Sequence, residues 1–548
     1  MVLRNRKLLV AAGILTVIGL LLASCGPAEE PTTGGPTTGE PTTGGPTGGP
    51  TGEITTLAPT ITGMRPPCDI LTTTSIGGTS FRQMVWDSLV DISSTGTIQP
   101  ALAESWKIAD NWSKVDFTLR QGLKWPNGDP FTAKDVVFSF GKFTEPGTTF
   151  NYSGDFIKYV KDAVAVDDYH VALNLKMAFP VLFDRLSATC AIYPKDYYEK
   201  LGQAGFAAAP MGLGPFKVID FKQDQFINVE ALPNHYRVTP TVAKIHLLNV
   251  TEPTTKVAML KTGEADVIYI DLDFVRDVAS DKNLQIVTNN DVYQYSFVVH
   301  DMVAGVADSP LLDLRVRQAV SLAVDRKTIC EKIFSGYAVA GNQFCAPYNQ
   351  GYDPNLPALT YDPVKAKQLL ADAGYPNGFD TTLTYTMARK NEHEAVAAYL
   401  NASNIRAKLV PTEAASYTTL RNSSARDPKA LKSLRGLTIH TVPYWVGILH
   451  TGAAMQSQMA GGSLQSAGVS NPAQVKLIEE SMSYAVGDPR LTAIGKQINE
   501  LALKDLWHIP LFRMTYNWGV GPKVVGGTYL VNPGNPYTFH YENLKLNK

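Results

Sequence analysis

The chain has 548 residues and a formal net charge of -1, with 49 lysines and arginines against 50 aspartates and glutamates. Binding to nucleic acid needs a concentrated basic surface, so this balance of charge argues against a nucleic-acid partner. Apolar residues make up 44% of the chain and charged residues 18%, which is typical of a globular protein. Since this length exceeds what one hydrophobic core supports, we expect two or three domains.

The N-terminus carries an export signal that ends at a cysteine. Basic residues within the first seven positions precede the apolar run Leu8–Leu22, and Ala23-Ser24-Cys25 follows it. The pattern resembles a bacterial lipobox, which implies that residues 1–24 are a lipoprotein signal peptide and that Cys25 is acylated. Several acyl chains on one residue would hold the mature protein on a membrane, in the periplasm or at the cell surface. The alternatives are an ordinary secretory signal and a transmembrane anchor, for which the run of about 15 apolar residues is short.

Residues 25–56 are rich in Pro, Thr and Gly and contain a crude five-residue repeat. Such a segment buries almost no apolar surface, so nothing offsets the entropy of ordering it. We therefore expect a flexible tether with a reach of roughly 30 Å. From Leu57 onward the composition is globular, and no later apolar run is long enough to span a bilayer.

The globular part alternates strands and helices, which predicts an α/β fold with mixed sheets. Helix ends are predicted from caps, prolines and glycines, and strands from alternating apolar residues. In chain order, the first expected elements are a hairpin bracketed by Trp106 and Trp125 and a helix that begins at Thr132 with Asp135 in its first turn. Next come a helix over Glu252 to Thr262 that stops at Gly263 and a strand over 265–270. The last expected elements are a long amphipathic helix from Arg315 to Phe334 after Asp313, a helix opened by Asp362-Pro363 that ends at Gly374, and a long helix from Asp488-Pro489 to about Trp507.

Four cysteines remain besides Cys25, at positions 68, 190, 330 and 345. Thiols outside the cytoplasm can pair, and the spacing of Cys330 and Cys345 leaves a local disulfide open against two buried thiols. The chain has no CxxC pattern and no histidine next to these cysteines, so a metal site built on them is not favoured.

Several sequence blocks resemble the signature of the family 5 extracellular solute-binding proteins, the receptors of oligopeptide, dipeptide and nickel ABC importers. The blocks follow the order of the family along the chain and together cover nearly all of the mature domain. They are Pro100–Trp106, Phe117–Trp125, Asn127–Val136, Gly212–Phe216, Leu260–Asp266, Arg315–Arg326, Tyr361–Pro376 and Ile509–Phe512. The blocks also have structural roles; Gly212 and Gly214, for example, are expected to permit a backbone path closed to other residues.

The resemblance implies a periplasmic-binding-protein-like, two-lobed clamp of the class II, cluster C type with an extra inserted domain. The implied divisions are a first lobe over 57–295 plus 506–548, an inserted subdomain at about 91–205, a second lobe over 296–505, and a hinge where the chain crosses near 295 and 505. The implied function is that of a lipid-anchored receptor that captures a peptide or other small organic solute and delivers it to the permease subunits of an ABC importer. We expect a monomer without cofactor or metal.

The segment from His440 to Gly447 is the most informative about the solute. In peptide receptors of this family a Trp here is closely followed by an Asp that pairs with the α-amino group of the peptide, whereas no acid follows Trp445. Burying an ammonium group without a counter-charge is costly, so free-amine peptides are not favoured. Tyr444 and Trp445 could stack on a neutral solute or a blocked peptide, or could be core aromatics.

Other candidate ligand-binding residues are weaker. Four aromatic residues flank the expected hinge crossings: Tyr293, Tyr295, Tyr516 and Trp518. His440 is a further candidate for ligand binding. Nickel receptors belong to the family, but two lone histidines, His440 and His450, are more often core or surface residues than metal ligands, so a nickel site is not favoured.

Two other functional classes compete with an importer receptor. One is a receptor that senses a ligand without transport. The other is an extracellular hydrolase, but the chain lacks the HExxH, Walker and GxSxG motifs, and Glu392-His393-Glu394 lacks a second histidine at helical spacing. The acid pair Asp271 and Asp273 is interpreted as a solvated strand face rather than as a glycosidase site.

Overall fold

The structure is a computed structural model. Its described residues are 50–57, 79–93, 97–110, 112–146, 148, 153–223, 225–299, 301, 306–413, 416–417, 436–441, 449–459, 471–532 and 535–547. The predictions for the signal peptide, the acylated Cys25, the tether as far as residue 49, Cys68, Tyr444 and Trp445 lie outside these residues. Residues 51–56 were expected in the tether, but they form most of a strand, β1 (Thr51–Leu57), so the expected end of the tether is wrong. Within them, no helix is both long and apolar enough to cross a membrane.

A large mixed sheet runs through the described chain and contains 11 of its strands. In sheet order these are β15 (Ile405–Thr412), β14 (Phe379–Thr386), β16 (Leu437–Thr441), β12 (Gln285–Val299), β17 (His508–Val520), β11 (Val267–Ile270), β1 (Thr51–Leu57), β10 (Val242–Leu248), β9 (Phe226–Ala231) and β8 (Phe216–Lys222), with β13 (Ala338–Ala340) paired to β17. β1 is parallel to β10 and β11, and β14 is parallel to β15 and β16, whereas the other pairs are antiparallel. The predicted α/β fold with mixed sheets is confirmed.

The smaller sheets are antiparallel. One has the order β4 (Ala103–Ile108), β5 (Lys114–Leu119), β7 (His170–Leu175), β6 (Val160–Ala165), and two pairs are β2 (Val90–Ile92) with β3 (Ile98–Pro100) and β18 (Val531–Asn532) with β19 (Asn535–Phe539). Trp106 lies in β4 opposite Phe117 of β5. The expected hairpin is therefore present, with Trp125 after its second strand.

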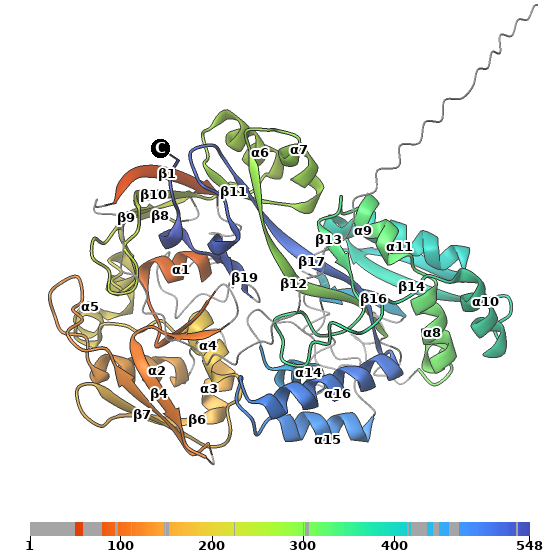
Figure 1. The fold of residues 1–548 in the computed structure, drawn as a ribbon, viewed down its shortest axis with the longest axis horizontal. Helices are drawn as coiled ribbons and strands as arrows, with labels where there is room; N and C mark the ends of the chain where they lie inside the picture. Colours follow the sequence, from red (N-terminus) through yellow and green to blue (C-terminus); the bar gives the residue numbers. More distant parts are fainter. Residues whose placement is uncertain are drawn as a thin grey trace, which may run out of the picture. The chain divides into compact units, whose positions relative to one another are not determined.

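The helices cover the sheets and fill the connections between strands (Figure 1). The described α-helices are α1 (Thr79–Val85), α2 (Ala133–Thr144), α3 (Ser153–Tyr159), α4 (Leu182–Thr189), α5 (Lys195–Ala208), α6 (Pro253–Thr262), α7 (Val275–Ala279), α8 (Leu314–Leu322), α9 (Arg326–Lys332), α10 (Pro363–Asp372), α11 (Lys390–Ala402), α14 (Thr451–Met459), α15 (Pro472–Ser481) and α16 (Pro489–Asp505). Short 3₁₀ turns are η2 (Leu272–Phe274), η3 (Pro310–Leu312), η4 (Met387–Arg389), η5 (Thr528–Leu530) and η6 (Tyr541–Asn543).

Most of the predicted helix ends are found where their capping residues placed them. Thr132 and Asp135 form a capping box at the start of α2. Gly263 ends α6 with a φ of 78°, a left-handed conformation that favours glycine. The Asp362 side chain accepts a hydrogen bond from the Lys365 amide at the start of α10, and the Asp488 side chain accepts one from the Arg490 amide at the start of α16.

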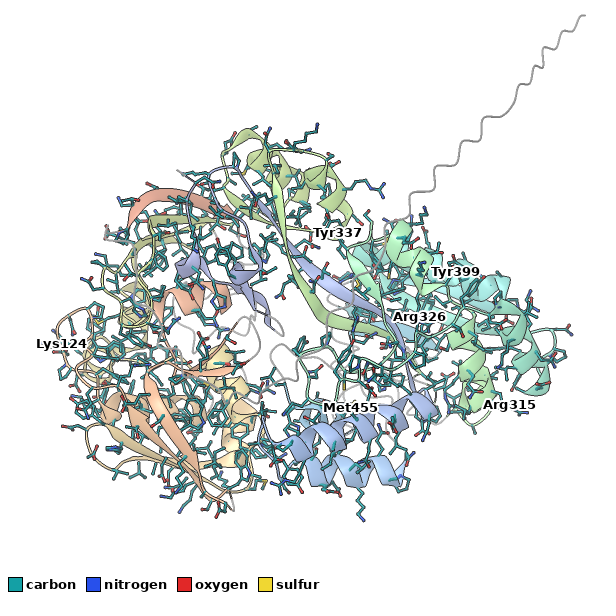
Figure 2. The ribbon with its side chains drawn as sticks, in the orientation of Figure 1. Lys124, Arg315, Arg326, Tyr337, Tyr399 and Met455 are labelled. Carbon is teal, nitrogen blue, oxygen red and sulfur yellow. The ribbon has the colours of Figure 1, made fainter. Side chains whose placement is uncertain are left out.

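The single long helix expected from Arg315 to Phe334 is wrong, because the chain forms α8 and α9 with a break between them. Asp325 starts a new helix: its carboxylate accepts hydrogen bonds from the amide and the hydroxyl of Thr328, at 3.0 and 2.7 Å. The buried guanidinium of Arg326, labelled in Figure 2, donates to the carbonyls of Ser321 and Val324 at the break. A cap inside an apolar periodic run therefore divides it into two helices.

Gly212 and Gly214 owe their identity to close packing rather than to an unusual φ. A Cβ at Gly212 would lie 1.9 Å from the carbonyl oxygen of Val85, and one at Gly214 would lie 2.6 Å from that of Met84. Gly214 also donates its amide to the Val85 carbonyl at 2.9 Å. The sequence prediction of a path closed to larger residues is confirmed, with the end of α1 as the cause.

β12 and β17 are the longest strands, and they pair with each other along most of their length. They connect two hydrophobic cores. Val287 of β12 and Trp518 of β17 belong to the first core, which includes β4 to β10 and the C-terminal residues, whereas Tyr295 and Phe512 belong to the second core, which includes α8 to α11. A β-bulge interrupts the register of β12 between Asn289 and Tyr293, between the two cores. Bulges bend a strand and increase its twist locally.

A separate cluster of buried apolar residues, the helical core, joins the last three helices to β12. It consists of Val298, Phe344, Met455, Ile478, Ile494, Ile498 and Ala502. Met455 of α14 is labelled in Figure 2, close to α16. The helical core thus fixes α14, α15 and α16 to the strand that enters the second core.

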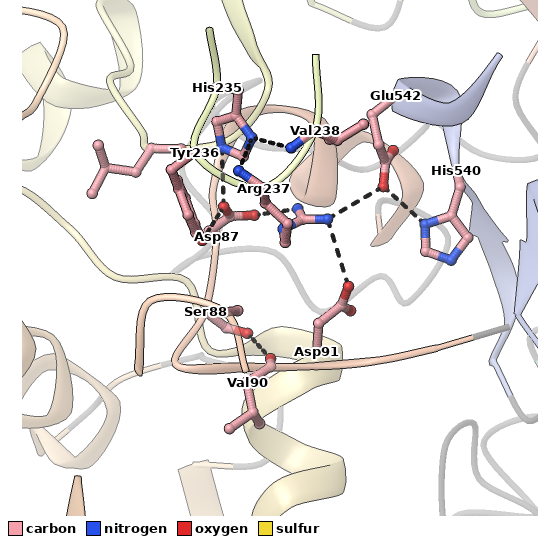
Figure 3. A network of polar contacts seen from close by, with 12 residues as sticks. Asp87, Ser88, Val90, Asp91, His235, Tyr236, Arg237, Val238, His540 and Glu542 are labelled. Carbon is pink, nitrogen blue, oxygen red and sulfur yellow. Dashed lines mark hydrogen bonds and ion pairs between the residues drawn. The ribbon is translucent and has the colours of Figure 1, made fainter. Parts of the chain in front are cut away.

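A buried ionic network ties the C-terminal residues to the end of α1 (Figure 3). The Arg237 guanidinium lies 2.7 Å from Asp87, 3.7 Å from Asp91 and 3.8 Å from Glu542. Asp87 also accepts a hydrogen bond of 2.6 Å from the hydroxyl of Tyr236. Burial raises the pKa of Asp87, but Arg237, His235 and Tyr236 outweigh it and hold that pKa at about 2. Asp87 is therefore ionised, and Arg237 neutralises it.

His540 completes this ionic network. Its Nδ1 atom lies 2.9 Å from Glu542, and its side chain is buried. Burial disfavours the charged imidazole, but Glu542 and Asp91 outweigh it and raise the pKa of His540. The network thus contains opposite charges in close contact, which is the condition for keeping ionised groups inside a protein.

The described cysteines are buried thiols. Cys190, Cys330 and Cys345 form no disulfide in the described part of the chain. Cys330 and Cys345 are therefore two buried thiols and do not form the local disulfide that the sequence left open. Burial raises the pKa of Cys330 to about 12, so this thiol is protonated and unreactive.

Candidate functional site

A cavity of about 370 Å³ lies at the carboxyl end of β11, beside β17 and the start of α11. It is lined by Tyr269, Asp271, Leu272, Asp273, Ile333, Phe334, Met387, Arg389, Lys390, Asn391, Glu392, Met514, Thr515 and Tyr516. Residues 269–273 of this lining precede β12 in the sequence, and the other lining residues follow it. A cavity of this size, lined by charged groups together with aromatic and apolar side chains, can hold a small organic molecule.

Arg389 is the central cation of the described lining. η4 and the first turn of α11 place it after β14, and its side chain is 36% exposed. Its guanidinium lies over the ring of Tyr295, 4.7 Å from the centroid, and donates a hydrogen bond to the Tyr295 hydroxyl. It also lies 3.5 Å from Glu392. Burial opposes its charge, but Tyr295 and Glu392 outweigh this and raise the pKa of Arg389.

Tyrosines form one wall of the cavity. The rings of Tyr269 and Tyr516 lie 5.0 Å apart at an interplanar angle of 40°. Both side chains are half-buried, so each presents part of its surface to the cavity. Tyr295 is 8% exposed and contacts the cavity through Arg389 rather than lining it. Aromatic faces of this kind can pack against planar or apolar parts of a solute.

Carboxylates contribute negative charge to the same cavity. Asp271 lies 3.7 Å from the ammonium of the buried Lys256, so it already has a counter-charge. Glu392 is 7% exposed, and burial raises its pKa although Arg389 opposes the change. Asp273 is exposed. Lys390 also lines the cavity and pairs with Glu394 at 3.6 Å. Arg389 differs from these charged groups because an aromatic ring, a tyrosine hydroxyl and a carboxylate together hold it in place.

The structure brings some of the predicted site residues together. Tyr516 lines the cavity, and Tyr295 holds Arg389. Trp518 does not line the cavity: it is fully buried in the first core and packs 4.6 Å from the ring of Phe539. Its position on β17 next to the crossing is as expected, but its side chain points to the core.

The side chains of the other predicted site residues, Tyr293, His440, Tyr444 and Trp445, lie outside the described part of the structure. Tyr293 lies in β12 opposite Met514, and the backbone of His440 pairs with Ser296 in β16. Tyr444 and Trp445 lie in the segment 442–448, outside the described residues. His450, the other histidine near this segment, is fully buried, and burial lowers its pKa to about 4. Among the described residues, no group of three or more His, Cys, Asp or Glu side chains is arranged to hold a metal ion.

Sequence reasoning missed Arg389, Tyr269 and the role of the acids. Asp271 and Asp273 follow β11 at the 3₁₀ turn η2 and line the cavity, so the expectation that they lie on a strand is wrong, whereas Asp273 is exposed to solvent as expected. In the sequence, Glu392 stands out only as part of an incomplete zinc motif. The available signal was positional: Asp271 and Arg389 each follow a strand of the sheet, and polar side chains at such strand ends are common binding residues.

Comparison with known proteins identifies the family. The sequence pattern of the family described as "Bacterial extracellular solute-binding proteins, family 5 Middle" matches residues 97–431, which is more than half of the chain. The chain belongs to the family 5 bacterial extracellular solute-binding proteins. The resemblance seen in the sequence blocks is thereby confirmed.

Two curated relatives of the family 5 chain are known by what they bind. The chain is 31% identical to Heme-binding protein A of Haemophilus influenzae over 332 residues, which cover 56% of this chain and 60% of the relative. It is 30% identical to Glutathione-binding protein GsiB of Escherichia coli strain K12 over 294 residues, which cover 52% and 55%. The chain thus matches less than two thirds of the length of each relative.

Solved structures share the fold over most of the chain. The ABC transporter substrate binding protein CtaP from Listeria monocytogenes has a TM-score of 0.77 at 18% identity, covering 91% of this chain and 100% of that one. The periplasmic binding protein DppA from Helicobacter pylori, in complex with the peptide STSA, has a TM-score of 0.69 at 22% identity, covering 91% and 98%. These likenesses confirm the predicted fold class, the periplasmic-binding-protein-like clamp with mixed sheets.

Proposed function

We propose that this family 5 protein is the solute-binding receptor of an ABC importer. It captures a peptide or other small organic solute outside the cytoplasm and delivers it to the permease subunits, without catalysing a reaction. The observation that carries the proposal is the cavity of about 370 Å³ at the crossing strands, in which Arg389 is held by Tyr295 and Glu392. The relatives that bind heme and glutathione, and the DppA neighbour with its bound peptide, support an organic solute.

Domain closure is part of this proposal. The first lobe would comprise 57–295 plus 506–548 with the inserted subdomain at about 91–205, and the second lobe would comprise 296–505. The separate first and second cores support this division, and the bulge in β12 between Asn289 and Tyr293 supports a hinge there. In such a clamp, the solute stabilises the closed arrangement by binding to it preferentially.

The proposed solute has a carboxylate but no free α-amino group. Arg389 offers a charged, planar donor group that suits a carboxylate. The sequence offers no acid after Trp445 to pair with an ammonium group. Of the acids that line the cavity, Asp271 is paired with Lys256, Glu392 is paired with Arg389, and Asp273 is exposed to solvent. An N-blocked peptide with a free C-terminus meets both conditions.

Calorimetry tests this proposed function. We expect a library of N-acetylated peptides to bind more tightly than the same peptides with free amines, and Trp445→Ala to weaken binding by roughly 1–3 kcal/mol through lost stacking and burial. Tight binding of free-amine peptides that Trp445→Ala leaves unchanged would contradict the proposed solute. Mass spectrometry of any compound that co-purifies with the protein provides an independent identification.

The anchor has its own prediction. We propose that Cys25 is acylated after removal of residues 1–24 and that the segment from Cys25 to residue 49 acts as a tether that holds the receptor near the membrane. Cys25→Ala removes the thiol that forms the thioether, so the protein is expected to leave the membrane fraction or to stay uncleaved. Fractionation followed by mass spectrometry of the N-terminus measures both. Unchanged processing and membrane retention in the variant would contradict the anchor; Cys330→Ala, which removes a buried thiol, is the control.

A further inference from the structure

Two hydrogen bonds join the inserted region to the segment that contains α14 and α15. The Leu449 amide donates to the Asp184 carboxyl on α4 at 2.9 Å, and the Trp112 indole donates to the Ser483 carbonyl at 3.2 Å. Ala453 and Ala454 of α14 also belong to the first core, together with residues of α4. This α4 contact is additional to the connection through β12 and β17, and it joins the parts that hinge motion would separate.

Asp184 is an unusual residue for such a contact because it is buried and, among the described residues, no cation is bonded to it. Its side chain is 1% exposed, and its Oδ2 atom has no hydrogen-bond partner among the described residues. The neighbouring Arg185 is bonded to Asp155 at 2.8 Å. Burial raises the pKa of Asp184 to about 7, although the Leu449 amide and Arg185 oppose the change.

The other charged groups that the structure describes around α4 do not compensate Asp184. Arg82 on α1 and Asp91 on β2, the elements against which α4 packs, line a small cavity with Ser187 and Cys190, and neither acts on the Asp184 pKa. On the side of Leu449, the His450 Nδ1 atom accepts the Ala453 amide, so its Nε2 atom carries the proton donated to the Ser481 carbonyl. His450 is therefore neutral and offers no counter-charge.

We propose that Asp184 is a positioning residue for solute capture: its protonated carboxyl holds the α14–α15 segment against α4, and its ionisation releases that segment. Protonated, the carboxyl satisfies the Leu449 amide without a buried charge. Ionised, it places an uncompensated charge inside the contact, which is costly unless water enters. The proposal rests on the proposed function only for its effect on capture, because the contact itself needs no solute.

The direction of the pH effect follows from proton linkage. When the contact opens and water reaches the carboxyl, its pKa returns toward the ordinary value of 3.8, so the closed contact binds more protons between that value and about 7. The closed contact is therefore favoured fully below the ordinary pKa and loses stability as the pH rises to about 7. The closing equilibrium changes by about tenfold for each pH unit in this range. Capture would accordingly be tighter on the acidic side of neutrality.

Hydrogen exchange of the full chain without solute tests the proposal. The quantity measured is the protection factor of a peptide over 449–459, corrected for the intrinsic pH dependence of exchange and compared with a peptide over 489–505 from α16. In the wild type we expect the ratio of the two protection factors to fall by about tenfold per pH unit from pH 5 toward pH 7. In Asp184→Asn, which keeps an acceptor for the Leu449 amide but does not titrate, we expect the ratio to stay constant.

Asp162→Asn is the matched control, because Asp162 is an exposed carboxylate on β6 of the inserted region. This variant is expected to keep the pH dependence of the wild type. A flat ratio in the wild type from pH 5 to pH 8, or an unchanged slope in Asp184→Asn, would overturn the proposal. If Asp184→Asn fails to fold, the wild-type titration alone still decides. The exchange experiment contains no solute, so its result does not depend on whether the protein is an importer receptor. Failure of the proposed role of Asp184 and failure of the proposed function are therefore distinguishable.

Discussion

Replacing Asp87 with asparagine is expected to lower the free energy of unfolding by about 3–5 kcal/mol, because it leaves Arg237, whose side chain is only 22% exposed, without its closest counter-charge. The amide side chain can still accept one hydrogen bond from Arg237 or Tyr236, but it carries no charge. Total stabilities of domains are only about 5–15 kcal/mol, so this is a large fraction. Urea unfolding at pH 7, followed by circular dichroism, measures the difference.

The pH dependence separates this charge effect from a packing defect. The pKa of Asp87 is about 2 in the folded protein, below the ordinary value of 3.8. Its carboxylate therefore contributes stability above the ordinary pKa, and that contribution is lost as the pH falls through about 2. The gap between wild type and Asp87→Asn is expected to shrink at pH 3 and below. A packing defect would leave the gap constant.

Asp116→Asn is the control for this prediction. Asp116 forms an exposed ion pair with Lys114 at 2.8 Å, with side chains 43% and 47% exposed. Exposed pairs of this kind contribute about 0–1 kcal/mol. A loss below 1 kcal/mol in Asp87→Asn at pH 7, no larger than in Asp116→Asn, would show that the ionic network of Figure 3 does not stabilise the fold.

Helix ends were predictable from the sequence because their causes are local. Asp362 and Asp488 cap helices within their own first turns, and Gly263 ends α6 through its own φ. The break before α9 was missed because the apolar period continues through it, while the Asp325 cap that causes it looks like any polar residue on the outer face. Arg326 also fills the gap through a contact with the Pro510 carbonyl, which lies far away in the sequence.

The candidate site was less predictable than the fold because tertiary structure assembles it. The family resemblance indicated crossings near 295 and 505, and β12 and β17 are the strands that run there. It did not indicate which aromatic side chains face the cavity: Tyr516 does, whereas Trp518, two positions along the same strand, is buried beneath Phe539 and Tyr269. Arg389 and Tyr295 are 94 residues apart in the sequence, so only the folded sheet shows that they are partners.

Replacing Arg389 with glutamine is expected to weaken the binding of a carboxylate solute by about 2–5 kcal/mol, the range for truncating one partner of a hydrogen-bonded charge pair that becomes buried when the solute covers it. That range corresponds to a loss of affinity of roughly 30-fold or more. The C-terminal amide of the same N-acetylated peptide should lose much less, because it has no charge to pair. Calorimetry of both peptides against wild type and variant gives the coupling between the guanidinium and the carboxylate.

Two further variants make the Arg389 result specific. Arg389→Lys keeps the positive charge but not the planar pair of donors, so it should restore only part of the affinity. Arg406→Gln removes an exposed arginine that pairs with Asp380 at 2.7 Å and does not line this cavity, and it should leave binding unchanged. Because Arg389 also holds the hydroxyl of Tyr295, thermal unfolding of each variant must accompany the titrations. Equal losses for the acid and the amide in a folded Arg389→Gln protein would mean that Arg389 shapes the cavity but does not bind the carboxylate.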